Sequence, residues 1–277
     1  MATNTYPFAI NSYSYIMDRS AFDCLGHFAE MGYGGAEIMN YPGHLWPEDA
    51  DPPARRAFRA RADQLGLRLI SLNMPNVDLN IAAAAPEMRA YSLGFVESVV
   101  RLAGDLGVAG VVIGPGKPNP LFPAPREQLT GHFHAALDRL APLAARAGTA
   151  LWVENLPVSF LPDIGSLIDA LDSYGDDAIG VVYDLANAVF VKEDIAFGLR
   201  RAKPRLRLVH LSDTGLSVYR HDPVGQGVVP FALVPPLLAE IGHGELPMLE
   251  IISNHADADI RASSDALLAM GFARDRA

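Results

Sequence analysis

Short apolar runs alternate with longer, helically spaced stretches along the whole chain. Eight runs rich in β-branched and other apolar residues are candidate strands. They are FAINSYSY at 8–15, YGGAEIM at 33–39, LRLISLNM at 67–74, VAGVVIGP at 108–115, TALWVEN at 149–155, IGVVYDL at 179–185, LRLVHLSD at 206–213 and LPMLEIIS at 246–253. Strands that alternate with helices in this way are typical of βαβ units around a parallel sheet.

Several of the intervening stretches place apolar residues three and four positions apart, as one face of a helix requires. The clearest extends from Leu129 to Ala144, and Gly148 follows it as a C-cap. The stretches 86–106 and 231–241 have the same spacing and are also followed by glycine. Each predicted helix therefore carries one apolar stripe that can pack on a sheet.

Eight strands with helices between them predict one domain, a single (β/α)8 TIM barrel over residues 1–277. The structural alternative is a doubly wound open sheet, because the pattern does not show whether the first and last strands pair. No run is followed by a GxGxxG turn, and the nearest candidate, GPGKPNP at 114–120, continues into prolines that do not open a helix. The barrel is the favoured prediction.

Composition and charge narrow the classes of partner. Half of the residues are hydrophobic and 19% are charged, which is enough apolar material for a large core, and the net charge of −10 disfavours nucleic acid. No apolar run is long enough for a membrane span, and no positive charge precedes Arg19, so we expect a cytoplasmic protein. Cys24 is the only cysteine and is expected to be a packed core thiol.

Polar residues lie in the carboxyl-terminal parts of the last four candidate strands. Glu154, Asp184, His210 and Glu250 fall there, at the barrel rim where functional groups gather. Any one of them could be a helix cap or a hydrogen-bonded core residue. Three buried carboxylates together would take up protons unless a cation compensates them, so the set predicts one divalent metal ion. Its hard donors favour Mn²⁺, with Mg²⁺, Co²⁺ or Zn²⁺ also possible.

These motifs resemble the xylose isomerase-like TIM barrels, a superfamily of sugar isomerases, ketose 3-epimerases, inosose dehydratases and apurinic-site endonucleases. The similarity extends over nearly the whole chain. The segments that carry it are LWVEN, VVYDLAN, VHLSD and MLEI around the four rim residues, HDPVGQG at 221–227, and LNMPNVDLNIA at 72–82. The four rim residues match the Glu, Asp, His, Glu ligands of the single-metal isomerases and epimerases.

The sequence also departs from parts of this superfamily. Asn187, Gly114 and Asn73 stand where the multi-metal endonucleases carry histidines, and Tyr219 replaces an aspartate, although His221 is kept. A nuclease would therefore lack most of its metal ligands. The glutamate and histidine that the 3-epimerases place near strands five and six are absent too, so the resemblance leaves the substrate open.

The resemblance implies a metal-dependent isomerase or epimerase of a sugar or polyol ketone. Glu154 and Glu250 would be the acid/base pair that moves a proton beside a metal-polarised carbonyl, and Asp184 and His210 would complete the ligand set. The alternative is a dehydratase, a lyase acting on an inosose-like or dehydroshikimate-like substrate. A non-catalytic sugar-binding barrel or an endonuclease is less favoured.

We expect a small carbohydrate as substrate and a homo-oligomer as a possible assembly. Neutral substrates are favoured over phosphorylated ones, because the chain is acidic and has only three lysines. Candidate substrate-binding residues are Arg220 and His221 in the loop 214–227, the possible polar lining residues Asn187, Asn73, Asn155 and His44, Trp46 as a cover, and Lys117.

Overall fold

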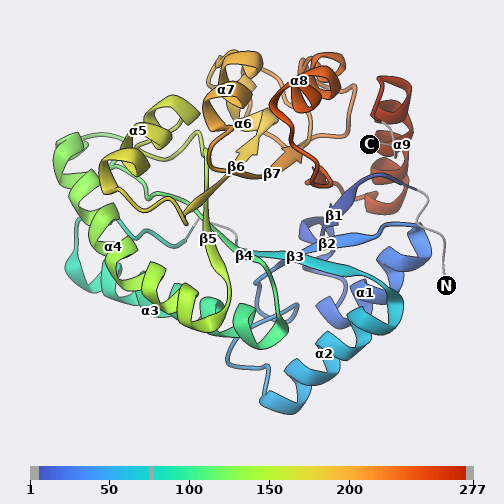
Figure 1. Cartoon of the computed structure of the whole chain (residues 1–277), viewed down its shortest axis with the longest axis horizontal. Coiled ribbons are helices and arrows are strands. Elements are labelled where there is room, and N and C mark those ends of the chain that lie inside the picture. The colour runs from blue at the N-terminus through green and yellow to red at the C-terminus, as the bar shows by residue number, and fades with distance from the viewer. Residues whose placement is uncertain (1–5, 75–77, 273–277) are drawn as a thin grey trace.

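The computed structural model describes residues 6–74 and 78–272 and contains eight parallel strands closed into a barrel, with helices around it (Figure 1). The strands are β1 (Ala9–Asn11), β2 (Gly35–Met39), β3 (Arg68–Asn73), β4 (Gly110–Ile113), β5 (Ala150–Glu154), β6 (Gly180–Asp184), β7 (Leu206–Leu211) and β8 (Met248–Leu249). β1 pairs with β8 through Ala9 opposite Met248 and Ile10 opposite Leu249. This pairing closes the sheet, so the predicted (β/α)8 barrel is confirmed over the open alternative.

The helices follow the strands in the expected order, with two of them between β6 and β7. They are α1 (Ala21–Met31), α2 (Pro52–Leu65), α3 (Pro86–Leu106), α4 (Arg126–Ala147), α5 (Ile164–Tyr174), α6 (Leu185–Phe190), α7 (Ile195–Ala202), α8 (Val234–Ile241) and α9 (Ala256–Ala269). Gly107, Gly148 and Gly242 end α3, α4 and α8 in the left-handed conformation, as their positions predicted. No helix in the described part of the chain is long and apolar enough to span a membrane.

The first and last strands are shorter than the apolar runs that predicted them. The run at 8–15 leaves the sheet after Asn11, whose side-chain Oδ1 accepts a hydrogen bond from the Tyr13 amide, and the 3₁₀ helix η1 (Tyr13–Tyr15) follows. The run at 246–253 leaves it after Leu249. The stretch at 231–241 likewise begins as a 3₁₀ turn, η2 (Phe231–Leu233), before α8. Residues 75–77, within the segment 72–82, lie outside the described residues.

The barrel interior is filled at one level by apolar side chains. This layer consists of Ala9, Ile70, Val112, Trp152, Val182, Leu208 and Met248. Trp152 is the largest member and requires glycine beside it, because a Cβ on Gly110 would come within 2.2 Å of the indole ring. A second, larger cluster, which includes Cys24, joins the strands to the surrounding helices.

On five strands, a polar side chain follows two residues after the member of this apolar layer. Side chains two positions apart in a strand point to the same face, so the residues that follow the layer also point into the barrel. The pairs are Ala9 and Asn11, Trp152 and Glu154, Val182 and Asp184, Leu208 and His210, and Met248 and Glu250. The apolar layer is therefore the floor on which the polar site rests.

Candidate metal and active site

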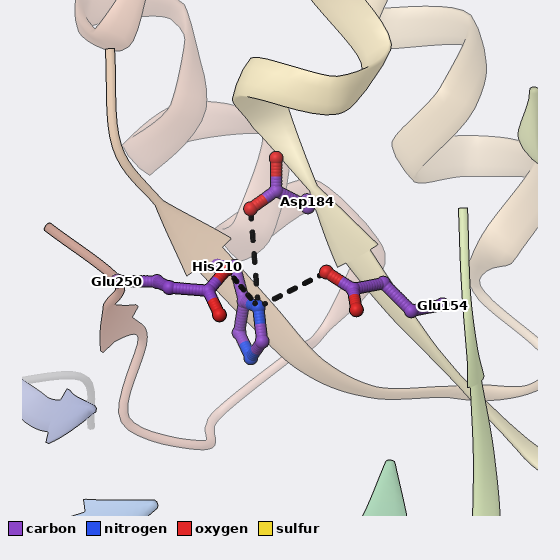
Figure 2. Close-up of side chains that lie close together, drawn as sticks. All are labelled: Glu154, Asp184, His210 and Glu250. Atoms are coloured by element: carbon purple, nitrogen blue, oxygen red, sulfur yellow. Dashed lines mark hydrogen bonds and ion pairs between the residues drawn. The ribbon is translucent and has the colours of Figure 1, made fainter. Parts of the chain in front are cut away.

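Three carboxylates surround one ring nitrogen of His210 at the carboxyl ends of β5 to β8 (Figure 2). His210 Nδ1 lies 3.0 Å from Glu250 Oε2, 3.4 Å from Glu154 Oε1 and 3.8 Å from Asp184 Oδ2. All four side chains are buried, and one ligand atom from each lies within 4.8 Å of the others. The four residues that sequence placed at the strand ends therefore converge on one point.

The two oxygens of Asp184 have different surroundings. Oδ1 caps α6 by accepting a hydrogen bond from the Asn187 amide at 2.6 Å, whereas buried Oδ2 has no hydrogen-bond partner and faces the cluster. Asn155 fixes the backbone of Asp184: its Oδ1 accepts from the Asp184 amide and its Nδ2 donates to the Asp184 carbonyl. Asp184 is thus both a helix cap and a member of the cluster.

Burial and mutual repulsion shift the pKa values of the cluster apart. Burial, followed by repulsion from Glu250 and Glu154, raises the pKa of Asp184 well above its usual range. Burial is also the largest cause that raises the pKa of Glu154 to about 7. Burial acts in the same direction on Glu250, but attraction to His210 and His221 outweighs it and lowers the pKa. Burial opposes charge on His210, yet Glu37 and Glu250 raise its pKa well above the usual value.

The donor set suits a divalent metal ion. Three carboxylates and one imidazole are hard or borderline ligands of the kind that bind Mn²⁺, Mg²⁺, Co²⁺ or Zn²⁺. Bound at this point, a cation would give the unpartnered Asp184 Oδ2 a charge partner and compensate the neighbouring acids. The residues therefore fit the cofactor that their sequence positions predicted.

Glu37 is a fourth acidic side chain of this region, and the sequence pattern did not point to it. It lies in β2, is fully buried, and its Oε1 is 3.2 Å from His210 Nε2, on the side of the ring that faces away from the cluster. In the sequence, Glu37 is distinguished only as a single acid inside the apolar run YGGAEIM. Functional groups of a barrel are expected at strand ends, whereas Glu37 lies in the middle of β2.

A cavity of about 410 Å³ opens beside the cluster and is large enough for a small molecule. It is lined by Tyr13, Met39, Asn73, Met74, Glu154, Leu156, Val158, Tyr219, Arg220, His221, Asp222, Glu250 and Ile252. Glu154 and Glu250 thus line this cavity as well as meeting at His210. Arg220 is its one cationic side chain among the described residues, apart from the histidine, and it is largely exposed.

His221 is held on both of its ring nitrogens. Nδ1 lies 2.9 Å from Ser212 Oγ and 3.4 Å from Glu250 Oε2, and Nε2 lies 2.9 Å from the Tyr219 hydroxyl. Tyr219 therefore orients a histidine in the cavity wall. Burial is the largest cause that lowers the pKa of His221.

The other residues considered for substrate binding occupy several places. Asn73 lines the cavity, whereas Asn187 and Asn155 lie behind the ligands, where Asn187 Nδ2 donates to Glu154 Oε1 at 3.3 Å. His44 and Trp46 line a separate cavity beside α1 and α2, at the turn that the bridge between Tyr41 and Leu45 closes after β2. His44 is hydrogen-bonded to Ser12, and Trp46 packs on Phe95. Lys117 lines a small neighbouring cavity.

Comparison with known proteins agrees with this architecture. The model of the family described as xylose isomerase-like TIM barrel matches residues 25–270. A putative L-ribulose-5-phosphate 3-epimerase from Shigella dysenteriae is 21% identical over 170 residues, which cover 61% of this chain and 59% of the relative. The match thus spans less than two thirds of that relative's length.

Two solved structures share the fold over almost their full length. A D-tagatose 3-epimerase-like protein superposes with a TM-score of 0.82 at 20% identity, covering 95% of this chain and 96% of the other. The IOLI protein, whose structure holds a zinc atom, superposes with a TM-score of 0.78 at 17% identity, covering 96% and 99%. At these identities the likeness establishes the fold. The match of the family model to most of the chain shows that it belongs to the xylose isomerase-like TIM barrel family.

Proposed function

We propose that this protein is a metal-dependent epimerase or isomerase of a small ketose or polyol ketone. The observation that carries the proposal is the placement of two carboxylates from different sides of the barrel. Glu154 and Glu250 both line the cavity and both approach the same nitrogen of His210. The named relatives support the reaction class, since one is called a 3-epimerase and another 3-epimerase-like.

Glu154, Asp184, His210 and Glu250 would hold the metal ion. When bound, a divalent cation would polarise the substrate carbonyl and stabilise negative charge on its oxygen. One structural neighbour is described with a bound zinc atom, which supports a divalent ion in a barrel of this fold. We keep Mn²⁺ as the favoured ion on the chemistry of three oxygen donors and one nitrogen donor.

The two glutamates would carry the proton. One removes it from the carbon next to the carbonyl, and the other returns a proton to the opposite face of the planar intermediate, so the configuration of that carbon inverts. β5 and β8 lie three strands apart around the barrel, so the two carboxylates reach the cavity from different directions. Arg220 and His221, in the cavity wall, would bind substrate oxygens.

We further propose that the substrate is neutral rather than phosphorylated. Three carboxylates line the cavity, namely Glu154, Glu250 and Asp222, against the largely exposed Arg220, whose Nη1 lies 3.9 Å from Asp222 Oδ1. Glu154 and Glu250 would share their charge with the metal ion, and Asp222 offsets Arg220, so the described lining leaves no uncompensated arginine or lysine for a phosphate. We expect L-ribulose to have a higher kcat/KM than L-ribulose 5-phosphate, measured side by side; a clear preference for the phosphate would contradict this.

Exchange with solvent deuterium tests the reaction class. Metal-loaded protein is incubated in D₂O with tagatose, psicose and ribulose, and the products are followed by NMR and mass spectrometry. Epimerisation should place deuterium at the carbon that inverts, whereas a dehydratase would release a product lighter by one water. Absence of deuterium incorporation and of water loss across the panel would contradict an enzyme of this kind.

Substitution of the two glutamates tests their assignment. Glu154→Gln and Glu250→Gln should each reduce exchange by at least about a hundredfold, because proton transfer by a positioned side chain contributes at least that much. Metal content is measured in the same samples, so that loss of the ion is distinguished from loss of the base. Near-normal turnover in both variants would refute the pair.

A further inference from the structure

Glu37 is a fully buried carboxylate without an arginine or lysine partner among the described residues. Its Oε1 accepts hydrogen bonds from Asn11 Nδ2 at 2.5 Å and Asn73 Nδ2 at 3.1 Å, and its Oε2 accepts one from Ser71 Oγ at 2.6 Å. These donors are uncharged. A buried acid with so few partners is costly, so the further polar group that faces it matters most.

That group is His210. The two ring nitrogens of His210 have different neighbours. Nδ1 lies near the three ligand carboxylates, and Nε2 lies 3.2 Å from Glu37 Oε1. Nε2 has no other hydrogen-bond partner, and Glu37 Oε1 is the acceptor that lies within reach of its N–H. An imidazole that binds a metal through one nitrogen carries its proton on the other, where an acceptor fixes ring orientation and tautomer.

Glu37 also reaches Glu250 through Asn11. The same Nδ2 group of Asn11 donates to Glu37 Oε1 and, at 3.2 Å, to Glu250 Oε1. Asn11 is itself fixed, because its Oδ1 accepts from the Tyr13 amide. A change at Glu37 would therefore disturb one ligand directly and a second one through a single side chain.

The pairing of β2 with β3 is irregular at this residue, because Ala36 pairs with Leu69 and Glu37 with Ser71, which leaves Ile70 of β3 as the extra residue. The pairing register of β2 against β3 shifts between Ala36 and Glu37. Such irregularities bend a strand and redirect a side chain, and they are frequent next to active sites. The shift brings Ser71 opposite Glu37, and Ser71 Oγ donates a hydrogen bond to Glu37 Oε2.

We infer that Glu37 is a positioning residue of the metal centre, which holds His210 with Nδ1 directed at the metal and Nε2 protonated. The inference rests on the metal site proposed above. Glu37 does not itself line the cavity, although it accepts a hydrogen bond from the lining residue Asn73. Its contribution to the metal centre acts through His210 and, by way of Asn11, through Glu250.

Metal affinity in a matched pair of variants tests the inference. Glu37→Gln keeps the size of the side chain and removes its charge. Glu193→Gln makes the same change at a partly buried acid outside the cluster. Glu193 accepts hydrogen bonds from the Tyr183 hydroxyl and from the Ile164 amide at the start of α5. The dissociation constant for Zn²⁺ and Mn²⁺ is measured by competition with a chelator, and folding is checked by thermal melting of the same samples.

We expect Glu37→Gln to weaken metal binding by about tenfold to a hundredfold, the usual effect of losing such a partner, and Glu193→Gln to stay within about twofold of the parent. In zinc-loaded parent protein, ¹⁵N NMR of His210 should show Nδ1 ligation and a protonated Nε2. In Glu37→Gln this single tautomer should be lost or mixed, which a merely structural role would not produce.

Unchanged metal affinity and an unchanged His210 tautomer in folded Glu37→Gln would overturn the inference and leave the metal site standing. A parent protein that binds no metal would overturn both. If Glu37→Gln does not fold, Ser71→Ala removes one of the donors that fix Glu37; we then expect metal binding to weaken severalfold, and full affinity in that variant would contradict the role of Glu37.

Discussion

At the scale of single residues, Asp184 serves two structures with its two oxygens. One oxygen caps α6 and the other points into the cluster without a hydrogen-bond partner. Sequence alone left open whether this strand-end acid was a cap or a ligand, and the structure shows that the cap uses only one of its atoms. The two contributions can therefore be separated by substitution.

Asp184→Asn should separate them. The amide oxygen can still cap α6, so we expect chelator-treated variant to unfold at the same temperature as the parent or higher, because one of the crowded acids is gone. Metal affinity should fall by at least about a hundredfold, since a charged ligand is lost. Asp184→Ala should in addition lose about 1 kcal/mol of stability with the cap. Tight metal binding by Asp184→Asn would contradict the ligand assignment.

At the scale of strands and helices, the two-residue period of side chains along a strand explains why the sequence predicted both the apolar layer and the ligands. Trp152 and Glu154, or Leu208 and His210, are neighbours on one face, so apolar runs ending in a polar residue located both the barrel floor and the ligands. Glu37 escaped because it sits within its strand rather than at the end. Asn155 was taken for a lining residue, whereas it bonds the Asp184 backbone, a contact between strands that one strand's pattern does not contain.

The fit of Trp152 between strands gives a stability prediction. Gly110→Ala would place a Cβ within 2.2 Å of the indole ring, so we expect unfolding to become easier by about 1 to 3 kcal/mol, as overpacking usually costs. Gly131→Ala is the control: this exposed position within α4 has open space around it, and the substitution should stabilise by about 0.5 to 1 kcal/mol. Denaturant titration measures both. A neutral Gly110→Ala would show that the floor is not tightly packed.

Contacts of Glu193 at the start of α5 predict that the stability of the protein depends on pH. Glu193 accepts hydrogen bonds from the Ile164 amide and Tyr183, and burial, followed by repulsion from Asp163, raises its pKa from 4.5 to about 7. The folded state therefore holds more protons than the unfolded state between these pH values, and the associated stability is lost as pH rises from about 4.5 to 7.

Glu193→Gln should remove this part of the pH dependence. Because Glu193 is only partly buried, we expect the effect to be about 1 to 2 kcal/mol after allowing for solvent screening. Unfolding free energies of parent and variant at pH 5 and pH 7.5 measure it. Parallel stability curves for the two proteins would show that Glu193 does not titrate in this range.

At the scale of the whole molecule, the barrel brings together residues that are far apart in the chain. The ligands come from β5 to β8 and Glu37 from β2, and closure of β1 on β8 places all of them around one interior. The sequence pattern contained the strand count but not the closure, since pairing between the first and last strands leaves no local signature. Assembly into a homo-oligomer stays a prediction, which sedimentation of the purified protein would test.

Anomalous diffraction from metal-loaded crystals is the most direct test of the metal centre on which the proposed chemistry depends. We predict one strong peak, about 2.0 to 2.3 Å from Asp184 Oδ2, His210 Nδ1 and an oxygen of each of Glu154 and Glu250. Full metal occupancy at some other place, or crystals of active protein with no anomalous peak at this rim, would contradict it.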